Sequence, residues 1–257
     1  MKAHVETVQQ QFDPQAQAYL SSQVHAQGPD LAWVREQVLP TLPPEAAVLD
    51  IGCGAGHLAF ALAERGARVT ALDPSPSMLH TVSREAAARG LSQIDTVEGL
   101  AHCLPFADGQ FDLVASRYSA HHWEALPAAL AEMRRVLKPD GMLLMIDVEG
   151  DETALVDTHL QAMELLRDRS HIRNRAPSEW RRLLTLAGFT VASHRQWPTR
   201  LAFEAWVTRM RTPPVQVQAI RALQDGAPAE VRTALAIEAD GSFQVTTGAM
   251  LAKRAVE

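Results

Sequence analysis

Short apolar runs alternate along the first part of the chain with longer segments whose apolar residues recur at helical spacing. A short run of Val, Leu, Ile and Ala between turn residues is typical of a strand buried on both faces, whereas spacings of three and four residues predict an amphipathic helix. The alternation of the two predicts an α/β fold with a doubly wound, mostly parallel sheet. The predicted strands are 46–51, 67–73, 93–99, 111–117 and 142–148, and the predicted helices are 30–39, 57–66, 75–90 and 124–137.

Glycine and proline mark the turns between these elements. Gly66 and Gly90 are expected to end two helices, and the pair Asp108-Gly109 predicts a turn before the fourth strand. The sequence Lys-Pro-Asp-Gly at 138–141 is expected to end the helix before the fifth strand. No internal repeat interrupts the alternation, so we expect a single domain over residues 1–257.

The stretch Leu-Asp-Ile-Gly-Cys-Gly-Ala-Gly-His-Leu, residues 49–58, directly follows the first apolar run. Its glycines Gly52, Gly54 and Gly56 indicate a tight backbone turn or the close approach of a ligand. A dinucleotide-binding loop has its third glycine three residues after the second, where this chain has His57. A loop for nucleoside triphosphates ends in Gly-Lys-Ser or Gly-Lys-Thr, and no lysine lies nearby. The spacing therefore disfavours both kinds of phosphate ligand.

Two carboxylates flank the glycine turn. Asp50 lies at the end of the first strand, where a negative charge disfavours a pyrophosphate and favours a ligand with an ammonium and a sulfonium group. Asp73 ends the second strand roughly 20 residues on, the position from which a carboxylate binds ribose hydroxyls. The alternative for Asp73 is a role only as the N-cap of helix 75–90. The acids and the turn together predict S-adenosylmethionine as the ligand.

Composition narrows the class of protein. The chain has 257 residues, of which 47% are hydrophobic and 21% charged, and these values are ordinary for a soluble enzyme with one core. A net charge of -6 disfavours a nucleic-acid-binding surface. We expect no membrane span and no signal peptide. The two cysteines, Cys53 and Cys103, are expected to be free thiols in a reducing cytoplasm.

Four segments in a fixed order resemble the motifs of class I S-adenosylmethionine-dependent methyltransferases. They are residues 48–56, 69–79, 104–123 and 132–147. The sequence is most similar to the branch that includes the ubiquinone/menaquinone-biosynthesis C-methyltransferases. The resemblance implies a Rossmann-like sheet of seven strands with an antiparallel last strand and a helical lid. The alternating segment 241–254 suits that last strand.

The resemblance also implies which residues contact the cofactor. The glycine turn would line the methionine moiety, Asp73 would hold the ribose, and Pro74 would lie near the adenine. Cys53 is expected to be a small filler rather than a nucleophile, and Met78 is as well explained by core packing as by adenine contact. The full expected set is Tyr19, Asp50, Gly52, Cys53, Gly54, Gly56, Asp73, Pro74, Met78, Leu100, Ala101, His102 and Arg117.

One position departs from the family pattern. Relatives often carry an aspartate where this chain has Leu100, and that aspartate accepts a hydrogen bond from the adenine amino group. Because the acid is missing, the adenine is expected to be recognised through backbone groups and His102.

The two flanks are expected to cover the site. Residues 1–40 are similar to the N-terminal helical cover of this branch, with Tyr19 and His25 as its inward-facing residues. Residues 199–239 have apolar positions at helical spacing around a Thr-Pro-Pro break, which predicts an insertion of two or three helices near the acceptor pocket. A cluster of basic residues has two interpretations, a binding site for an anionic acceptor or a solvated helix face. Its members are Arg167, Arg169, Arg173 and Arg175.

His121 and His122 are the candidate catalytic residues. They follow the fourth strand at the carboxyl edge of the sheet, where open sheets bind ligands, as do Arg117 and Tyr118. Methyl transfer from a sulfonium is an in-line displacement that depends on alignment and exclusion of water, so a base is needed only for a hydroxyl or an acidic carbon. Adjacent helical residues diverge by about 100°, so we expect only one histidine to face the acceptor and favour His121. The alternative is that the pair only packs and caps the helix.

We therefore expect a cytoplasmic S-adenosylmethionine-dependent methyltransferase that acts on a small-molecule acceptor. No metal and no nucleic-acid partner are expected, and the protein is expected to be a monomer or a homodimer. Two alternatives are open. One is a protein that binds S-adenosylmethionine without activity, and the other is a nicotinamide-dependent oxidoreductase, which the glycine spacing and Asp50 disfavour.

Overall fold

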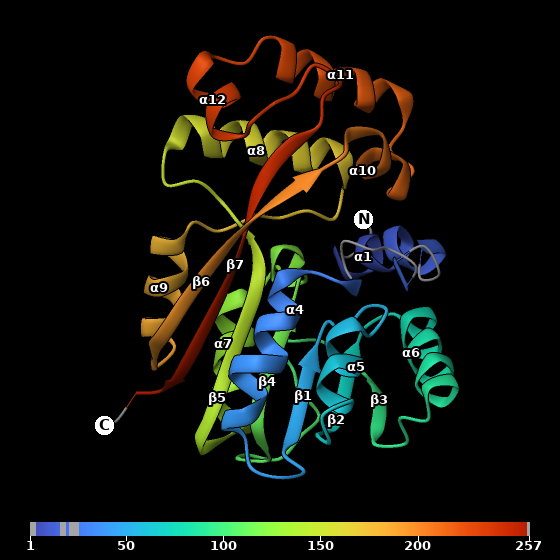
Figure 1. Cartoon of the computed structure of the whole chain (residues 1–257), viewed down its shortest axis with the longest axis vertical. Helices are drawn as coiled ribbons and strands as arrows, with labels where there is room; N and C mark the ends of the chain where they lie inside the picture. Colours follow the sequence, from blue (N-terminus) through green and yellow to red (C-terminus); the bar gives the residue numbers. More distant parts are fainter. Residues whose placement is uncertain (1–3, 16–18, 21–25, 256–257) are drawn as a thin grey trace.

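The computed structural model of the chain describes residues 4–15, 19–20 and 26–255. A seven-stranded sheet of order β3-β2-β1-β4-β5-β7-β6 runs through the molecule (Figure 1). Strand β7 is antiparallel to both of its neighbours, whereas the pairs among β1 to β5 are parallel, which confirms the predicted sheet. The strands are β1 (Ala47–Ile51), β2 (Arg68–Asp73), β3 (Ile94–Glu98), β4 (Phe111–Arg117), β5 (Leu137–Glu149), β6 (Phe189–Leu201) and β7 (Phe243–Arg254).

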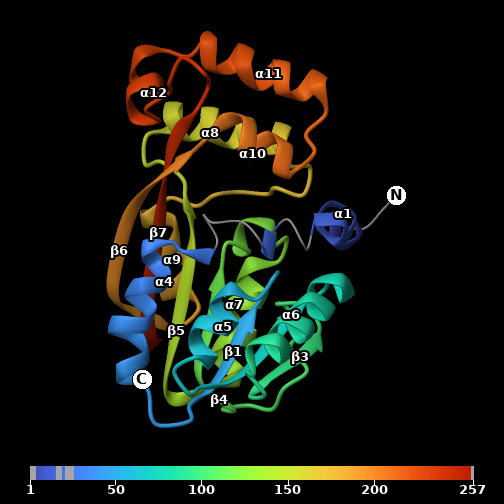
Figure 2. The same cartoon turned by 45° about the vertical axis from the view of Figure 1, so that its right-hand side comes forward.

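Helices cover both faces of the sheet and gather beyond one of its ends (Figures 1 and 2). Within the described residues, no helix is both long and apolar enough to cross a membrane. The helices are α1 (His4–Phe12), α4 (Pro29–Trp33), α5 (His57–Ala63), α6 (Pro76–Arg89), α7 (Leu126–Val136), α8 (Ala154–Arg167), α9 (Pro177–Leu186), α10 (Phe203–Arg209), α11 (Pro214–Asp225) and α12 (Ala229–Ala234).

The central strands are apolar throughout because both of their faces are buried. The register places Val48 beside Leu113 and Leu49 beside Val114. Val48 and Leu113 belong to the core under α4, α5 and α6, and Leu49 and Val114 belong to the core under α7 and α9. Successive residues of one strand therefore pack into two separate cores on opposite faces of the sheet.

A third core holds the helices at the end of the sheet together. It joins α8 to α10, α11 and α12 and to the far ends of β6 and β7, with Trp206 and Phe243 at its centre. Three helices thus lie between β6 and β7, within the region 199–239 where an insertion of two or three helices was expected. Helix α1 lies between this group and α5 and α6 in both views (Figures 1 and 2).

The start of β5 differs from the prediction. Residues 138–141 were expected to separate the helix from a fifth strand that starts at residue 142, but β5 begins at Leu137 and runs through them. Leu137 pairs with Phe111, and the next pair along the two strands joins Leu113 to Met142. The extra residues are therefore accommodated as an irregularity within a strand, because Leu137 is fixed in the core beside Phe111.

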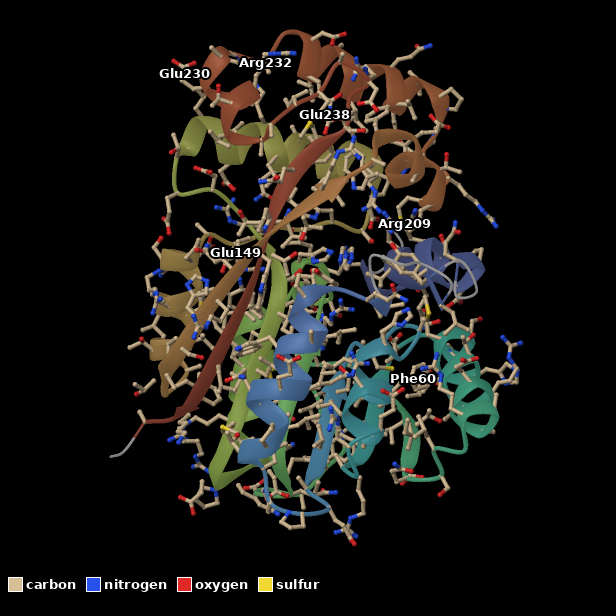
Figure 3. All side chains as sticks on the ribbon, in the orientation of Figure 1. Phe60, Glu149, Arg209, Glu230, Arg232 and Glu238 are labelled. Carbon is tan, nitrogen blue, oxygen red and sulfur yellow. The ribbon has the colours of Figure 1, made fainter. Side chains whose placement is uncertain are left out.

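Gly56 is required by local packing at the start of α5. Its φ of +88° is left-handed, and a Cβ there would lie 2.8 Å from Cζ of Phe60 and 2.9 Å from Cγ2 of Val82. Phe60 is buried on α5 (Figure 3). Arg89 of α6 lies over its ring. Gly66 has a similar φ of +90° with no heavy atom within 4 Å of such a Cβ.

We expect Gly56→Ala to lower the free energy of unfolding more than Gly66→Ala does. Both variants incur about 1–2 kcal/mol for a left-handed conformation, and Gly56→Ala adds a steric cost of about 1–3 kcal/mol against the buried Phe60. Equilibrium urea unfolding of the two variants measures the difference. Equal losses would show that α5 and α6 adjust freely around residue 56.

Candidate functional site

The glycine turn after β1 is fastened to the neighbouring strand ends. The amides of Gly52 and Cys53 donate to the carbonyl of Leu72, at 2.8 and 3.1 Å. A side chain at position 52 would collide with the hydroxyl of Ser119, which follows β4. The turn therefore presents bare backbone at the carboxyl edge of the sheet, as the sequence predicts for the approach of a ligand.

A cavity of about 180 Å³ opens at this edge. Of the residues expected at the cofactor, Gly56 is the exception, because it packs under α5 and does not line the cavity. The residues of the expected set that line it are Tyr19, Asp50, Gly52, Cys53, Gly54, Asp73, Pro74, Met78, Leu100, Ala101, His102 and Arg117.

Asp73 connects the glycine turn to the start of α6. Its Oδ2 accepts from the amide of Gly54 and its Oδ1 from the amide of Ser75, both at 2.9 Å. Burial raises the pKa of Asp73 to about 6, against the effect of these two hydrogen bonds. Helix α6 is capped instead by Ser75, whose hydroxyl accepts from the amide of Met78, so the interpretation of Asp73 as the N-cap is wrong. Each carboxylate oxygen retains a second lone pair for a ligand hydroxyl.

Asp50 is a buried carboxylate that lacks a hydrogen-bond partner in the described part of the chain. It is 1% exposed, and within the described residues neither oxygen has a hydrogen-bond partner of normal geometry. Burial raises the pKa of Asp50 to about 7, with Arg117 acting in the opposite direction. An unpaired carboxylate beside a bare glycine turn suits a ligand with positive charge, so the site fits S-adenosylmethionine on this point.

Some of the remaining cofactor candidates only line the cavity, and others also pack against neighbouring side chains. Burial raises the pKa of the Cys53 thiol well above its ordinary value, so it stays protonated and fits the role of a filler. Met78 packs in a small core with Ala55, as its packing interpretation predicts. It also lines the cavity, and its contact with adenine stays a prediction. Leu100 and His102 lie on the short segment after β3, where the family's acid is missing.

Arg117 lies in the cavity wall but is held by Asp30 of α4. Its Nε donates to one carboxylate oxygen and its Nη2 to the other, the latter at 3.2 Å, and both side chains are buried. The guanidinium also lies 4.6 Å from the ring centroid of Tyr118. Sequence reasoning missed Asp30, because the partners are 87 residues apart and no local pattern connects them.

Helix α1 covers the cavity with its apolar face. Val5, Val8 and Phe12 line the cavity at spacings of three and four residues. These residues were not predicted individually, although their helical spacing was a signal that could have identified them. His25, expected to face inward, lies outside the described residues.

Polar contacts join this cover to two other elements. The side-chain amide of Gln9 donates to the carbonyl of Pro74 at 2.7 Å, before α6. The side-chain amide of Gln11 donates to the carbonyl of Met210 at 3.1 Å, after α10. The Tyr19 hydroxyl donates to the Met210 sulfur at 3.0 Å. The N-terminal segment thereby bridges the cofactor side of the sheet and the inserted helices.

A second, smaller cavity of about 80 Å³ adjoins the first. Phe12, Tyr19, Tyr118 and His122 line both cavities, so the two meet at these side chains. The walls of the second cavity come from α8, α10 and the far ends of β6 and β7. Arg209, at the end of α10, lies in this wall beside the N-terminal segment (Figure 3).

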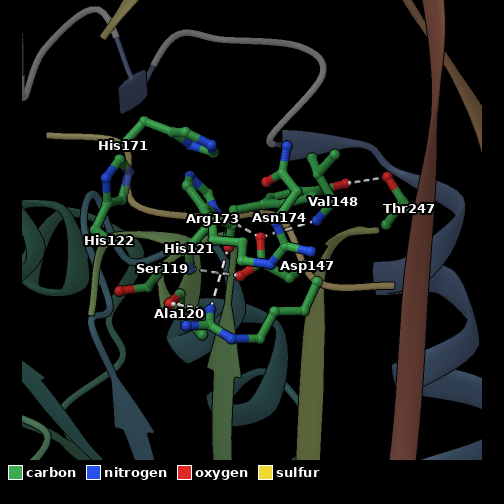
Figure 4. A network of polar contacts seen from close by, with 12 residues as sticks. Ser119, Ala120, His121, His122, Asp147, Val148, His171, Arg173, Asn174 and Thr247 are labelled. Carbon is green, nitrogen blue, oxygen red and sulfur yellow. Dashed lines mark hydrogen bonds and ion pairs between the residues drawn. The ribbon is translucent and has the colours of Figure 1, made fainter. Parts of the chain in front are cut away.

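His121 lines the second cavity and forms a dyad with Asp147 (Figure 4). Its Nδ1 lies 2.6 Å from Oδ1 of Asp147, and its amide donates to Oδ2 at 3.1 Å. Burial acts to lower the pKa of His121, but the adjacent Asp147 carboxylate outweighs it and the net pKa is raised. Because Nδ1 donates to a carboxylate, Nε2 is left as the basic nitrogen.

His122 lies beside His121 in a different environment. Their ring centroids are 4.1 Å apart, so the expectation that the two side chains diverge is wrong. The 3-10 turn Ala120–His122 carries both rings, and each is anchored by a separate partner. Nδ1 of His122 donates to the carbonyl of Ser170 at 3.0 Å. Burial, followed by the neighbouring His121, lowers the pKa of His122 to about 4.

The arginines of the basic cluster do not form one site. Arg167 lines the second cavity, and Arg169 is exposed. Arg173 is paired with Asp157 and Glu179, at 3.1 and 3.0 Å. The solvated-face interpretation therefore fits only part of the cluster, and one member turns toward the site.

Comparisons with known proteins agree with this geometry. A family described as a methyltransferase domain matches residues 49–145. The chain is 45% identical over 192 residues to the uncharacterized protein YafE of Escherichia coli, across 75% of this chain and 93% of that protein. It is 32% identical over 202 residues to the uncharacterized methyltransferase YcgJ of Bacillus subtilis, across 79% of both chains.

Two further likenesses extend the comparison. The crystal structure of YcgJ superposes on this chain with a TM-score of 0.82 and 27% sequence identity. The match covers 88% of this chain and 98% of the YcgJ chain. The demethylmenaquinone methyltransferase of Thermus thermophilus is 39% identical over 123 residues, across 47% of this chain and 56% of that protein.

We expect Asp73→Asn to weaken binding of S-adenosylmethionine at least tenfold. A charge-assisted hydrogen bond contributes roughly 1.5–3 kcal/mol, and an amide cannot accept from two hydroxyls as a carboxylate does. Isothermal titration calorimetry measures the affinity, and circular dichroism checks the fold. Asp95→Asn on β3, which does not line the cavity, is the matched control. Unchanged affinity in Asp73→Asn would show that Asp73 only stabilises the backbone turn and does not bind the cofactor.

We also expect the affinity for S-adenosylmethionine to fall roughly tenfold between pH 7.5 and pH 6. The pKa of Asp50 is about 7 without ligand, and a cationic ligand prefers the ionised carboxylate and lowers that pKa. Protons therefore compete with the ligand as the pH falls below 7. Calorimetry across this range measures the effect, and Asp50→Asn should flatten most of it. A wild-type affinity that does not change with pH contradicts the role assigned to Asp50.

Proposed function

The chain belongs to the S-adenosylmethionine-dependent methyltransferases, and from this premise we propose that it methylates a small molecule held in the second cavity. The observation that supports this acceptor site is that the two cavities meet at Phe12, Tyr19, Tyr118 and His122. A small ligand in the second cavity lies next to a cofactor in the first. The net charge of -6 favours a small molecule over a nucleic acid as the acceptor.

The residues of the first cavity fit S-adenosylmethionine, which supplies an electrophilic methyl group when bound. Asp73 would accept the ribose hydroxyls, and Asp50 would face the positively charged end. Pro74 and Met78 would lie beside the adenine. In place of the acid missing at Leu100, backbone groups and His102 would recognise the adenine.

Alignment and exclusion of water supply most of the rate in an in-line displacement from a sulfonium. Helix α1 covers the first cavity, and its contacts through Gln9 and Gln11 reach both α6 and α10. Trp206 and Arg209 of α10 wall the second cavity. We infer that residues 1–40 and 199–239 act together as the cover that excludes water from both ligands.

The dyad of His121 and Asp147 provides a base for acceptors that must lose a proton. The basic Nε2 of His121 belongs to a side chain that lines the second cavity, and Asp147 stabilises the protonated ring that results. Asp147 is in turn held by the amide of Val148 at 2.8 Å. A protein that only binds the cofactor has no use for this dyad, so it favours catalysis over the binding-only alternative.

Incubation of the purified protein with cell extract and methyl-labelled S-adenosylmethionine tests the proposal. We expect label in a small molecule, identified by mass spectrometry, that is absent with Asp73→Asn protein. Label in nucleic acid or protein, or no label despite measured cofactor binding, contradicts the proposed acceptor class.

We expect His121→Ala to lower the single-turnover rate by roughly 10²–10⁴-fold with cofactor affinity retained. The base must be neutral to accept a proton, so the wild-type rate should fall as the pH drops through the raised pKa of His121, above 6.5. Asp147→Asn removes the carboxylate that raises the pKa of His121, and burial then lowers this pKa. The fall in rate at acidic pH should therefore move to lower pH in this variant. Rate profiles from pH 5 to 9 measure this. Near-wild-type rates in both variants would show that His121 is not a base and that the rate depends on alignment of the two ligands alone.

A further inference from the structure

His122 and Asp168 present two hydrogen-bond acceptors to each other. Nδ1 of His122 lies 3.0 Å from the carbonyl of Ser170, which cannot donate, and 3.2 Å from the Ser170 hydroxyl, which donates to Asp168. The proton therefore resides on Nδ1, and Nε2 is an acceptor. Nε2 lies 3.9 Å from Oδ2 of Asp168, which is too long for a direct hydrogen bond. We call the space between these two atoms the notch.

The carboxylate of Asp168 is fixed by Ser170. The Ser170 amide and hydroxyl donate to Oδ1, at 2.8 and 2.6 Å. Oδ2 accepts no hydrogen bond from the described residues and belongs to a side chain that lines the second cavity. Asp168 is 2% exposed, so Oδ2 is poorly placed to be satisfied by bulk solvent.

His122 is not protonated near neutral pH, so its Nε2 does not donate a hydrogen to Asp168. Burial and the neighbouring His121 lower the pKa of His122 to about 4, even though Asp168 acts to raise it. Both side chains line the second cavity, and two acceptors at this separation are stabilised by a group that donates a hydrogen between them. His122 lines both cavities, so that donor lies where the cofactor pocket meets the acceptor cavity.

We propose that the notch between His122 and Asp168 binds the hydroxyl group of an aromatic or enolic acceptor, which is methylated on that oxygen. The inference rests on the proposed function and specifies its acceptor. His121, whose Nε2 is basic, also lines the second cavity, and its ring centroid lies 4.1 Å from that of His122. Neutral amines need no base, whereas a hydroxyl does.

The step balances with the groups present. The hydroxyl oxygen forms a bond to the methyl carbon as the bond from that carbon to sulfur breaks. During the reaction the hydroxyl turns about its C–O bond, so that its single proton leaves the notch and passes to Nε2 of His121. The sulfur takes the electron pair and leaves in S-adenosylhomocysteine. A phenolic hydroxyl has a pKa near 10, within about four units of imidazole, whereas an aliphatic hydroxyl is closer to water at about 15.7.

The cavity walls suit an unsaturated ring. Phe12, Tyr118 and Trp206 line the second cavity together with the aliphatic side chains of Leu201 and Val245. Aromatic side chains pack favourably on a planar ring and leave its hydroxyl free for polar partners.

Calorimetry with two matched probes tests the proposal. The protein saturated with S-adenosylhomocysteine is titrated with 4-methylphenol, which stays protonated at neutral pH, and with 4-methylanisole, which lacks the donor. We expect 4-methylphenol to bind at least tenfold more tightly. In Asp168→Asn the amide would donate to His122 from within the protein, so this preference should collapse to less than threefold.

Glu164→Gln is the matched control, because it removes one carboxylate from the same cavity and leaves the notch intact. The preference for 4-methylphenol should persist in it. Binding of S-adenosylhomocysteine to each variant checks the fold and tests the cofactor site independently, and the wild-type comparison requires no variant. Equal affinities for the two probes, no binding of either to the saturated protein, or an unchanged preference in Asp168→Asn overturns the proposal. A labelled extract product methylated on carbon, nitrogen or sulfur also overturns it and leaves the proposed function standing.

Discussion

Burial of charge at the carboxyl edge of the parallel strands is the constraint on which this site depends. Asp50, Asp73, Arg117 and Asp147 lie at or near the ends of β1, β2, β4 and β5, and all four are buried. Parallel strands end at one edge, so the topology alone brings these groups together. A buried charge is tolerated only where it is paired or hydrogen-bonded. The elements that cover the edge supply such partners, as α4 does when it places Asp30 against Arg117.

Asp50 is the exception among these four groups, because the described residues supply no hydrogen-bond partner for its carboxylate. Asp73 receives two backbone amides and Asp147 receives a histidine and two amides, whereas Asp50 has no such partner among the described residues. With a pKa of about 7, Asp50 is partly protonated near neutral pH without a ligand, and a bound cation favours its ionised form. We therefore propose that recognition of the cofactor depends on the ionisation of Asp50 as well as on the shape of the glycine turn.

Features that depend on local pattern and strand order were predictable from the sequence. Periodicity located the strands, and the spacing of Gly52, Gly54 and Asp73 predicted a ligand site at the edge where the first cavity opens. Contacts between distant segments were not predictable, since the partners of Arg117 and His122 lie on α4 and in the loop after α8. Gly56 shows the same limit. Its spacing pointed to a ligand, but its neighbours in the fold are Phe60 and Val82.

Two adjacent histidines with opposite pKa shifts illustrate how tertiary contacts divide the roles of identical side chains. Asp147 raises the pKa of His121 against the effect of burial. Burial, followed by the charge on His121, lowers the pKa of His122. Because the rings are 4.1 Å apart, protonation of one disfavours protonation of the other. One ring can therefore accept a proton while its neighbour stays neutral and keeps a fixed tautomer. Neither role is readable from the pair His121-His122 itself, because the residues that assign them, Asp147 and Ser170, join the site only in the folded chain.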